Sequence, residues 1–433
     1  MSETVGEGAV LQKVEELLTE AWLSHLTTEQ LLVLVASEAK KNWTSRQENN
    51  NADWVIAIDR WLAQRPTSST SIPLIQLSSL PIIGRQSSIK YTARSSISQD
   101  MNMATPGSPE WLELVSEEII DPVQRIIDPH HHLWIRPGND YVLENLWQDT
   151  GSGHNVEKTV FVECHAEYLK EGPDHLKPLG EIRFVVSQAE LSALGVGSEI
   201  AGIVAHADLT HEALREVLDA HVNLGEGRFR GIRHAAAHAE HPEALLIAGR
   251  APAGLYQREE FRAGVRLLGE LDYTYDTWHY HYQNQDFCEL ARSAPGTTMI
   301  LDHFGTPLGV GPYADKRAEI FEQWKLDMAD IANCDNVVAK IGGLAMPDNG
   351  FNWHSRELPP TSDEFVAAQR DYYLHTIDCF GPDRCMFESN FPVDKFSISY
   401  HVLFNGFKKI VSDFSASERD AMFYGTAART YKI

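Results

Sequence analysis

The sequence predicts an α/β fold, specifically a (β/α)8 TIM-type barrel with an N-terminal helical extension. Three observations lead to this prediction. From Arg125 onward, short β-branched runs alternate with amphipathic helical stretches, as they do in repeated βα units. The runs number eight, which is the number of strands in such a barrel. Polar or ionisable residues stand directly after the runs, at the end of the strands where these barrels have their active sites.

Each predicted strand is a short apolar or β-branched segment bounded by polar residues, and helical periodicity recurs between the strands. The predicted strands are residues 125–128, 159–164, 203–207, 229–234, 271–275, 298–303, 337–341 and 384–388. The clearest predicted helices are residues 211–222, 257–270, 313–332 and 363–379. An open doubly wound sheet is the alternative, but the sequence has no Gly-rich nucleotide loop of the kind that accompanies it.

Upstream of the barrel the composition changes twice. Residues 1–65 contain Leu, Val, Ile and Trp at helical spacing, which predicts a small helical module. Residues 66–104 are rich in Ser and Thr with scattered Pro and have no sustained period, which is typical of a linker. The predicted catalytic domain therefore spans residues 105–433.

Charge and composition favour a cytoplasmic enzyme that acts on a small molecule. The 433 residues include 37 basic and 61 acidic side chains, and the net charge of −24 disfavours nucleic acids and anionic membranes as partners. No segment approaches the roughly 18 apolar residues that span a bilayer, and the acidic start is unlike a signal peptide. The absence of a P-loop predicts no nucleotide cofactor. The sequence leaves open whether the protein forms a homo-oligomer.

The chemistry is expected where the first predicted strand ends, in the segment Asp-Pro-His-His-His. His130 and His132 are two residues apart, so both side chains face the same way. Two neutral imidazoles held side by side can ligate a divalent metal or polarise a substrate oxygen. A polar loop without function is the alternative for an isolated run of this kind, and the repeated βα pattern around it favours a site.

Strands two and four add a carboxylate and a guanidinium. Glu163 stands in an otherwise apolar strand, where an unpaired carboxylate would be costly, and it shares a face with His165. Arg233 ends the fourth strand and could hold a substrate carboxylate through its planar fork. A structural salt bridge between Glu163 and Arg233 is the alternative for both residues.

Strands five to seven supply further candidates. A loop dense in aromatic and imidazole groups follows the fifth strand and contains His281. His303 follows the apolar sixth strand and is predicted to be the third imidazole of the site, with neighbouring Asp302 facing away. Lys340 in the seventh strand could point inward or outward, so the sequence assigns it no role.

Four motifs at these strand ends resemble the amidohydrolase superfamily. They are Asp-x-His-x-His after strand one, Gly-Ile-Arg-His at strand four, Leu-Asp-His-Phe-Gly at strand six and Ser-Asn-Phe-Pro at strand eight. The likeness covers roughly residues 120–433 and is greatest with the amidohydrolase-related branch (amidohydrolase 2), which includes lactone hydrolases and metal-dependent decarboxylases. It implies that His130, His132 and His303 are catalytic residues and metal ligands, and that His281 matches a histidine after strand five.

Strand eight departs from this family pattern. Members usually have an aspartate as metal ligand and base where this chain has Asn390, whose neutral amide cannot take up a proton at ordinary pH. Glu388 lies two residues earlier on the same face, where the family commonly has Gly, and could supply the missing carboxylate. Glu163 is the competing base. The loss of the aspartate leaves open whether a divalent metal, zinc or manganese, binds to the histidines with Glu388.

Three functions are compatible with these residues. The first is hydrolysis of a lactone or related cyclic ester of a small carboxylate-bearing or sugar-derived substrate, with Glu163, Arg233 and His281 binding it and the other histidines stabilising the oxyanion. The second is metal-dependent, non-oxidative decarboxylation of a small aromatic or muconate-like acid. The third is an inactive barrel that serves as a binding or scaffold protein, which the Asn390 substitution supports and the many polar strand-end groups oppose.

Overall fold

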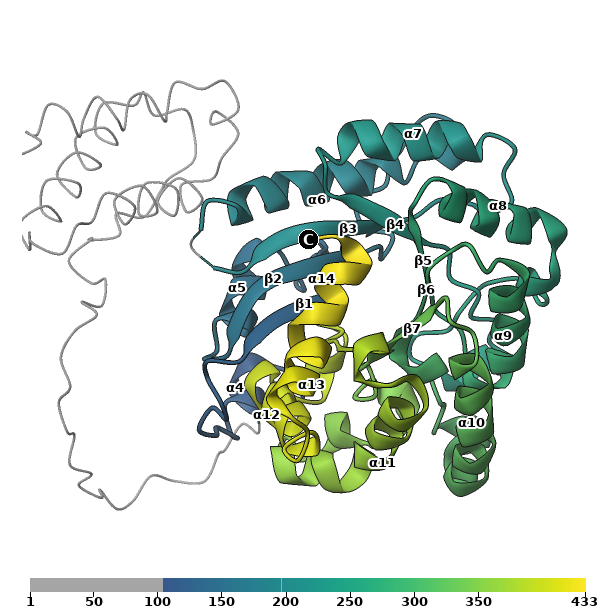
Figure 1. Ribbon diagram of the computed structural model, residues 1–433. Helices are drawn as coiled ribbons and strands as arrows, with labels where there is room; N and C mark the ends of the chain where they lie inside the picture. The colour runs from purple at the N-terminus through teal and green to yellow at the C-terminus, as the bar shows by residue number, and fades with distance from the viewer. Residues whose placement is uncertain (1–103, 196) are drawn as a thin grey trace, which may run out of the picture. The chain divides into compact units, whose positions relative to one another are not determined.

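The computed structural model describes residues 104–195 and 197–433 (Figure 1). Eight strands form one sheet, in which each strand pairs in parallel with the next from β1 to β8. They are β1 (Arg125–His131), β2 (Asn155–Val162), β3 (Glu199–Ala205), β4 (Phe229–Arg233), β5 (Thr274–Thr277), β6 (Met299–Leu301), β7 (Val337–Ile341) and β8 (Cys385–Phe387). A parallel bridge between His131 and Phe391 links the two ends of the sheet into a nearly closed barrel. The predicted TIM-type barrel is confirmed.

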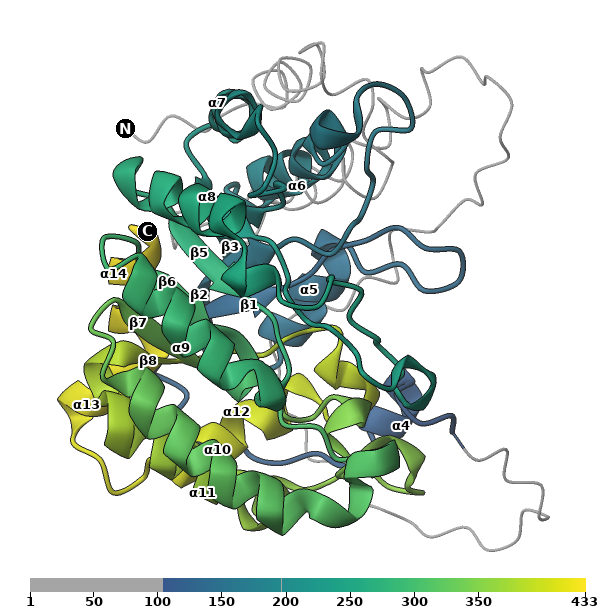
Figure 2. The same cartoon turned by 90° about the vertical axis from the view of Figure 1, so that its right-hand side faces the viewer.

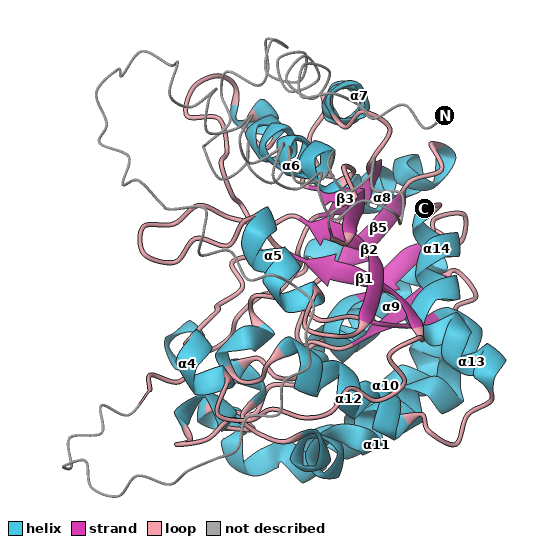
Figure 3. Cartoon of the chain, turned by 90° about the vertical axis from the view of Figure 1, so that its left-hand side faces the viewer, coloured by secondary structure: helices cyan, strands magenta, loops and turns pink. Residues whose placement is uncertain are grey.

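Helices occupy the connections between the strands. They are α4 (Pro109–Leu112), α5 (Leu143–Thr150), α6 (Leu179–Ser192), α7 (Leu214–Leu224), α8 (Glu259–Glu270), α9 (Asn284–Ser293), α10 (Arg317–Ala332), α11 (Ser362–Phe380), α12 (Tyr400–Ile410), α13 (Ala416–Asp420) and α14 (Thr426–Tyr431). Figure 2 shows α8, α9, α10 and α11 following one another across the outside of the barrel. Figure 3 shows the strands at the centre with helices around them.

The eight predicted strands are all present, and the shifted ends have local causes. β5 starts at Thr274 and not at residue 271, because Leu271 caps α8 and Asp272 turns the chain with a φ of +63°. β6 stops at Leu301 because a left-handed turn follows it directly. These differences change the strand lengths but not their order.

Some predictions fall outside the described residues. The helical module predicted at residues 1–65 lies there, as does the linker predicted at residues 66–104 except for residue 104 itself. Among the described helices, none combines the length and the apolar character needed to cross a bilayer.

The barrel interior begins with an apolar layer that the C-terminal helix closes. The buried side chains that meet in this layer are Ile127, Val160, Val162, Val204, Ile300, Met386, Ala427 and Tyr431. The last two belong to α14, which lies across β1 in Figure 1. Since side chains alternate along a strand, the next inward positions lie closer to the carboxyl ends of the strands. The candidate site is built there.

Candidate active site

Two buried carboxylates lie at the carboxyl end of the barrel, directly beyond the apolar layer. Ile300 and Met386 face the interior, and strand alternation brings Asp302 and Glu388, two residues further along, to the same side. Both carboxylates are at most 1% exposed. Charges buried to this degree need partners close by.

Glu388 lies between two of the predicted histidines. Its Oε2 atom is 2.7 Å from His130 Nδ1, and its Oε1 atom is 2.7 Å from His303 Nδ1 and 3.2 Å from the backbone nitrogen of His303. Burial raises the pKa of Glu388 to about 8, although the charge of Lys340 opposes the shift. Glu388 therefore occupies a position from which a carboxylate can exchange a proton with a reacting group.

The three predicted imidazoles meet in one place. The ring centroid of His130 is 4.9 Å from that of His132 and 4.5 Å from that of His303. His132 Nδ1–H donates to the carbonyl oxygen of Val162 at 2.8 Å, which leaves a lone pair on Nε2. Burial lowers the pKa of all three histidines, so they are neutral at pH 7. Neutral imidazole is the form that ligates metals.

The prediction that Asp302 faces away from the site is wrong. Asp302 Oδ2 is 3.7 Å from His130 Nδ1 and 3.8 Å from Arg233 Nη1. The strand alternation that places Asp302 inward ends with β6, and His303 then adopts a φ of +54°. This left-handed turn brings His303 to the same side as its neighbour. Burial raises the pKa of Asp302 to about 7 against the charge of Lys340.

Lys340 points into the barrel and joins these groups. Its Nζ atom is 2.7 Å from Asp276 Oδ2, 3.3 Å from Asp302 Oδ1 and 3.3 Å from His130 Nδ1. The Tyr431 hydroxyl donates to the same Asp276 oxygen at 2.5 Å. Burial alone would lower the pKa of Lys340, but the surrounding carboxylates raise it, so the ammonium stays charged. A chain of polar contacts therefore runs through the barrel from α14 to the site.

Glu163 and Arg233 form the salt bridge that was the structural alternative for both. Arg233 Nε donates to Glu163 Oε1 at 2.8 Å, and Arg233 Nη2 donates to the Glu163 carbonyl oxygen. Burial would raise the pKa of Glu163, but Arg233 and His206 outweigh it and lower the pKa to about 2. Arg233 Nη1 also lies 3.4 Å from His130 Nε2. Glu163 is thus a paired anion and a poor proton acceptor.

Asn390 and His281, the other two predicted site residues, have their side-chain contacts outside the histidine cluster. Asn390 has a φ of +55°, and its Nδ2 atom donates to Asp394 Oδ1 at 2.9 Å while its backbone N–H donates to the His130 carbonyl oxygen at 3.0 Å. The amide therefore fixes the loop after β8. His281 Nδ1 accepts from the Leu308 N–H at 3.3 Å, on the aromatic side of the barrel mouth. The contacts of His281 are not with the three clustered histidines.

Sequence reasoning missed Asp276, Asp302 and Lys340. For two of them the signal was the alternation of side chains, because Asp302 follows Ile300 by two positions and Lys340 follows Val338 by two. Ile300 belongs to the apolar layer, and Val338 packs against it. Asp276 and Lys340 are opposite charges on β5 and β7, the two strands that flank β6, and they meet because both side chains point into the barrel.

The donor set fits a divalent cation. Ligand atoms of His130, Asp302 and His303 lie within 4.8 Å of one another. Both carboxylate oxygens of Asp302 are buried without a hydrogen-bond partner in the described part of the chain. The site brings together more buried carboxylates than buried cations, namely Asp276, Asp302, Glu388 and Glu163 against Lys340 and Arg233. A divalent cation would displace the protons that Asp302 and Glu388 otherwise hold near neutral pH, and mixed imidazole and carboxylate donors suit zinc or manganese.

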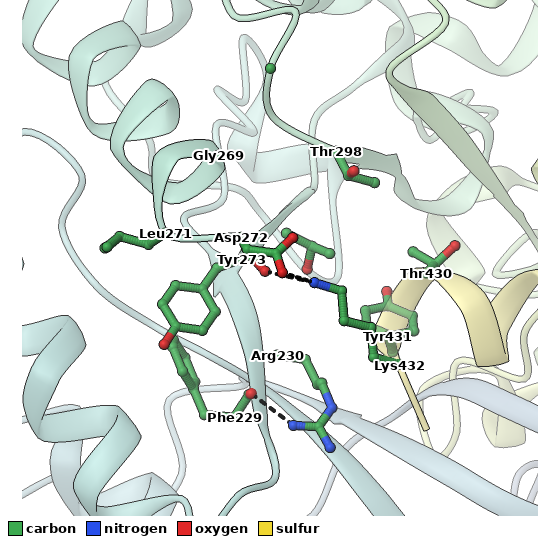
Figure 4. A pocket seen from close by; sticks show the side chains of 12 residues that line it. Phe229, Arg230, Gly269, Leu271, Asp272, Tyr273, Thr298, Thr430, Tyr431 and Lys432 are labelled. Carbon is green, nitrogen blue, oxygen red and sulfur yellow. Dashed lines mark hydrogen bonds and ion pairs between the residues drawn. The ribbon is translucent and has the colours of Figure 1, made fainter.

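A cavity of about 400 Å³ lies at the other end of the barrel (Figure 4). Its lining includes Phe229 and Tyr273 at the starts of two strands, together with Tyr431 and Lys432 near the C-terminus. The clustered histidines and carboxylates stand instead at or beyond the strand ends. We therefore assign the chemistry to that cluster and not to this cavity.

A barrel with buried imidazoles and carboxylates at the carboxyl ends of its strands defines the class of this protein as a (β/α)8 enzyme. Comparison with known families identifies the particular group, because the amidohydrolase family profile matches residues 127–433. The uncharacterized protein y4mH of Sinorhizobium fredii is 33% identical over 323 residues, which cover 71% of this chain and 98% of that protein. The chain belongs to the amidohydrolase family.

Two further relatives come from Burkholderia multivorans. L-fucono-1,5-lactonase is 26% identical over 324 residues, covering 71% of this chain and 96% of that enzyme. A crystal structure of an amidohydrolase with bound zinc is 22% identical and covers 71% of this chain and 99% of its own, with a TM-score of 0.54. The similarity to this crystal structure shows that the two proteins share a fold.

Proposed function

We propose that the protein hydrolyses a lactone or a related cyclic ester. The observation that carries the proposal is Glu388, a buried carboxylate with a pKa of about 8 between the neutral imidazoles of His130 and His303. Hydrolysis by activated water needs a proton acceptor of this kind beside groups that stabilise charge on the carbonyl oxygen. The relative named L-fucono-1,5-lactonase supports the choice of a lactone.

Glu388 rather than Glu163 is the base in this proposal. Glu163 is paired with Arg233, and its lowered pKa gives it little tendency to accept a proton. Glu388 takes a proton from water as the water oxygen bonds to the carbonyl carbon. The ring C–O bond then breaks and the departing oxygen receives a proton, so one lactone and one water give one hydroxy acid.

The tautomer of His132 bears on how the oxyanion is stabilised. Because Nδ1–H is used by the Val162 carbonyl oxygen, Nε2 has no proton to donate and is suited to ligate a cation. His130, Asp302 and His303, whose ligand atoms lie within 4.8 Å of one another, would hold that cation together with His132 Nε2, which leaves Glu388 to move the proton. A bound divalent metal supplies Lewis-acid polarisation of the carbonyl.

Glu388→Gln tests the proposal, because it removes the proton acceptor and keeps the shape of the side chain. With a lactone that the parent hydrolyses, we expect kcat/KM to fall at least about 100-fold, the usual range for a lost general base. Glu216→Gln, on the exposed face of α7, is the matched control and should behave as the parent does. Circular dichroism checks that both variants fold.

Other results would point to the alternative functions. Activity retained in Glu388→Gln would remove this residue from the mechanism. Carbon dioxide release from a dihydroxybenzoate, with no lactone hydrolysed by the parent, would support the decarboxylase hypothesis. No turnover of either substrate class would support a binding or scaffold protein.

A further inference from the structure

A second group of polar side chains lies beside the site, after the ends of β2 and β3. We call it the mouth cluster and define it as His165, Tyr168, His206 and the Oε2 atom of Glu163. The ring centroid of His165 is 5.2 Å from that of Tyr168 and 5.4 Å from that of His206. Arg233 links the two groups, since it contacts both Glu163 and His130. A substrate held at the clustered histidines therefore has the mouth cluster next to it.

Hydrogen-bond acceptors dominate the mouth cluster. His206 Nδ1–H donates to the Arg233 carbonyl oxygen at 3.0 Å, so His206 Nε2 carries a lone pair. Glu163 Oε2 is buried without a hydrogen-bond partner among the described residues, because Arg233 takes Oε1. The buried hydroxyl of Tyr168 also lacks a partner within that part of the chain. Polar atoms left unpaired in this way are costly unless a ligand satisfies them.

We propose that the mouth cluster binds the hydroxyl groups of an uncharged, polyhydroxylated ring, so that the preferred substrate is a sugar-type lactone and not a carboxylate-bearing one. A hydroxyl group can donate to Glu163 or His206 and accept from Tyr168, whereas a carboxylate brings only acceptors. A carboxylate would also meet the charge of Glu163 and find Arg233 already paired. This inference rests on the proposed lactone hydrolysis and adds the substrate class to it.

The backbone holds one member of the cluster in an unusual conformation. The His165 side chain is 66% exposed, and its Nε2 atom lies 3.7 Å from Glu163 Oε2. Its φ of +60° is unfavourable for a residue other than Gly and persists only where the surrounding structure imposes it. The strained turn presents the imidazole to solvent beside the unpaired carboxylate oxygen, where an arriving hydroxyl group would meet both.

Arg136 is the feature that competes with this inference. It is exposed in the loop after β1, and its guanidinium lies 4.1 Å from the ring centroid of Trp134. A carboxylate-bearing substrate could be attracted to it. The experiment therefore includes this residue.

Tyr168→Phe removes one hydroxyl group and keeps the ring. We compare kcat/KM for D-glucono-1,5-lactone, which carries hydroxyl groups, and for δ-valerolactone, which has the same ring size without them. For the first lactone we expect a loss of about 3- to 10-fold, the size of one neutral hydrogen bond, and for the second no change. Tyr273→Phe, at the opposite end of the barrel, is the control and should affect neither lactone.

Two kinetic results would overturn the inference. One is an equal loss for both lactones, which would mean that Tyr168 does not recognise hydroxyl groups. The other is a preference for a carboxylate-bearing lactone that Arg136→Gln abolishes.

A binding measurement separates this inference from the proposed hydrolysis. myo-Inositol is an uncharged ring of hydroxyl groups that cannot be hydrolysed, and calorimetry gives its Kd for the parent and for Tyr168→Phe. If no lactone is hydrolysed but inositol binds and the variant binds it about 3- to 10-fold more weakly, the proposed hydrolysis fails and the mouth cluster stands. If lactones are hydrolysed but inositol does not bind and the variant does not discriminate, the mouth cluster assignment fails alone.

Discussion

At the scale of single residues, Glu388 and Asn390 have different contacts, although only two positions separate them. Both side chains are buried after β8, but Asn390 uses its amide to hold Asp394, while Glu388 reaches His130 and His303. Glu388 follows the inward-facing Met386 by two positions, so strand alternation directs its carboxyl group into the barrel, whereas the left-handed backbone of Asn390 directs the amide elsewhere. Burial there has a cost, since an ionised carboxylate is poorly solvated inside the barrel.

That cost predicts how stability depends on pH. The pKa of Glu388 is raised from 4.5 to about 8, so between these values the folded state binds a proton that the unfolded state has released. Stability due to this group therefore falls as pH rises through that window. Glu388→Gln removes the titration, so we expect the Tm of the variant, relative to the parent, to rise from about pH 5 to about pH 9.

Thermal melts in a chelating buffer followed by circular dichroism measure this difference. Glu216→Gln again serves as control, since its exposed side chain should leave the pH dependence of the parent unchanged. A Tm difference between Glu388→Gln and the parent that is constant with pH would contradict the raised pKa.

At the scale of secondary structure, α14 supports the site from the far end of the barrel. Its Tyr431 side chain lies in the apolar layer, and the hydroxyl reaches Asp276, which in turn holds Lys340 against His130. Helix α14 thus takes part in placing a residue near the end of the first strand. This coupling comes from the closed barrel, because α14 and the candidate site contact opposite ends of the same interior.

Tyr431→Phe tests that coupling. Loss of a hydrogen bond to a charged partner costs about 1.5–3 kcal/mol, so the free energy of unfolding in urea should fall by that amount. We also expect kcat to fall, because Asp276 and Lys340 position His130. KM should stay unchanged, because the mouth cluster is at the other end of the barrel. Tyr424→Phe, whose ring stacks under Arg125, is the control and should keep the parent kcat. A variant with the parent's stability would show that the hydroxyl contact contributes nothing.

At the scale of the whole molecule, the barrel concentrates negative charge. The chain has a net charge of −24, and buried carboxylates also outnumber buried cations at the site. Charge on the surface is screened by solvent, whereas charge at the barrel centre is screened much less. A cation that binds only to the folded barrel should therefore stabilise the entire domain.

Zinc addition tests this expectation. At zinc concentrations 100-fold above Kd, binding to the folded state alone stabilises by about 2.7 kcal/mol, so calorimetry should show a higher Tm than in chelator. Asp302→Asn should lose most of this increase, because it removes a charged ligand atom. His375→Asn on the outer helix α11 should retain it. An unchanged Tm in the parent, with no zinc detected by elemental analysis, would contradict a metal site.

The barrel and much of its site could be predicted from the order of the amino acids. Eight apolar runs mark eight strands, and the alternation of side chains places His130 with His132 and gives Glu388 its direction. These features depend on local periodicity, which the sequence carries directly. The family resemblance follows from the same strand-end motifs, and the family profile confirms it.

The pairing of those groups depends on contacts between distant strands, which local sequence does not reveal. His303 and Asp302 share one side because a left-handed turn interrupts the alternation, and no pattern of apolar residues signals such a turn. Lys340 and Asp276 meet because β5 and β7 flank β6 and both side chains point into the barrel, and Glu163 is a paired anion because Arg233 lies beside it. Partners from distant strands set the charge and the pKa of each group, so local sequence cannot specify them.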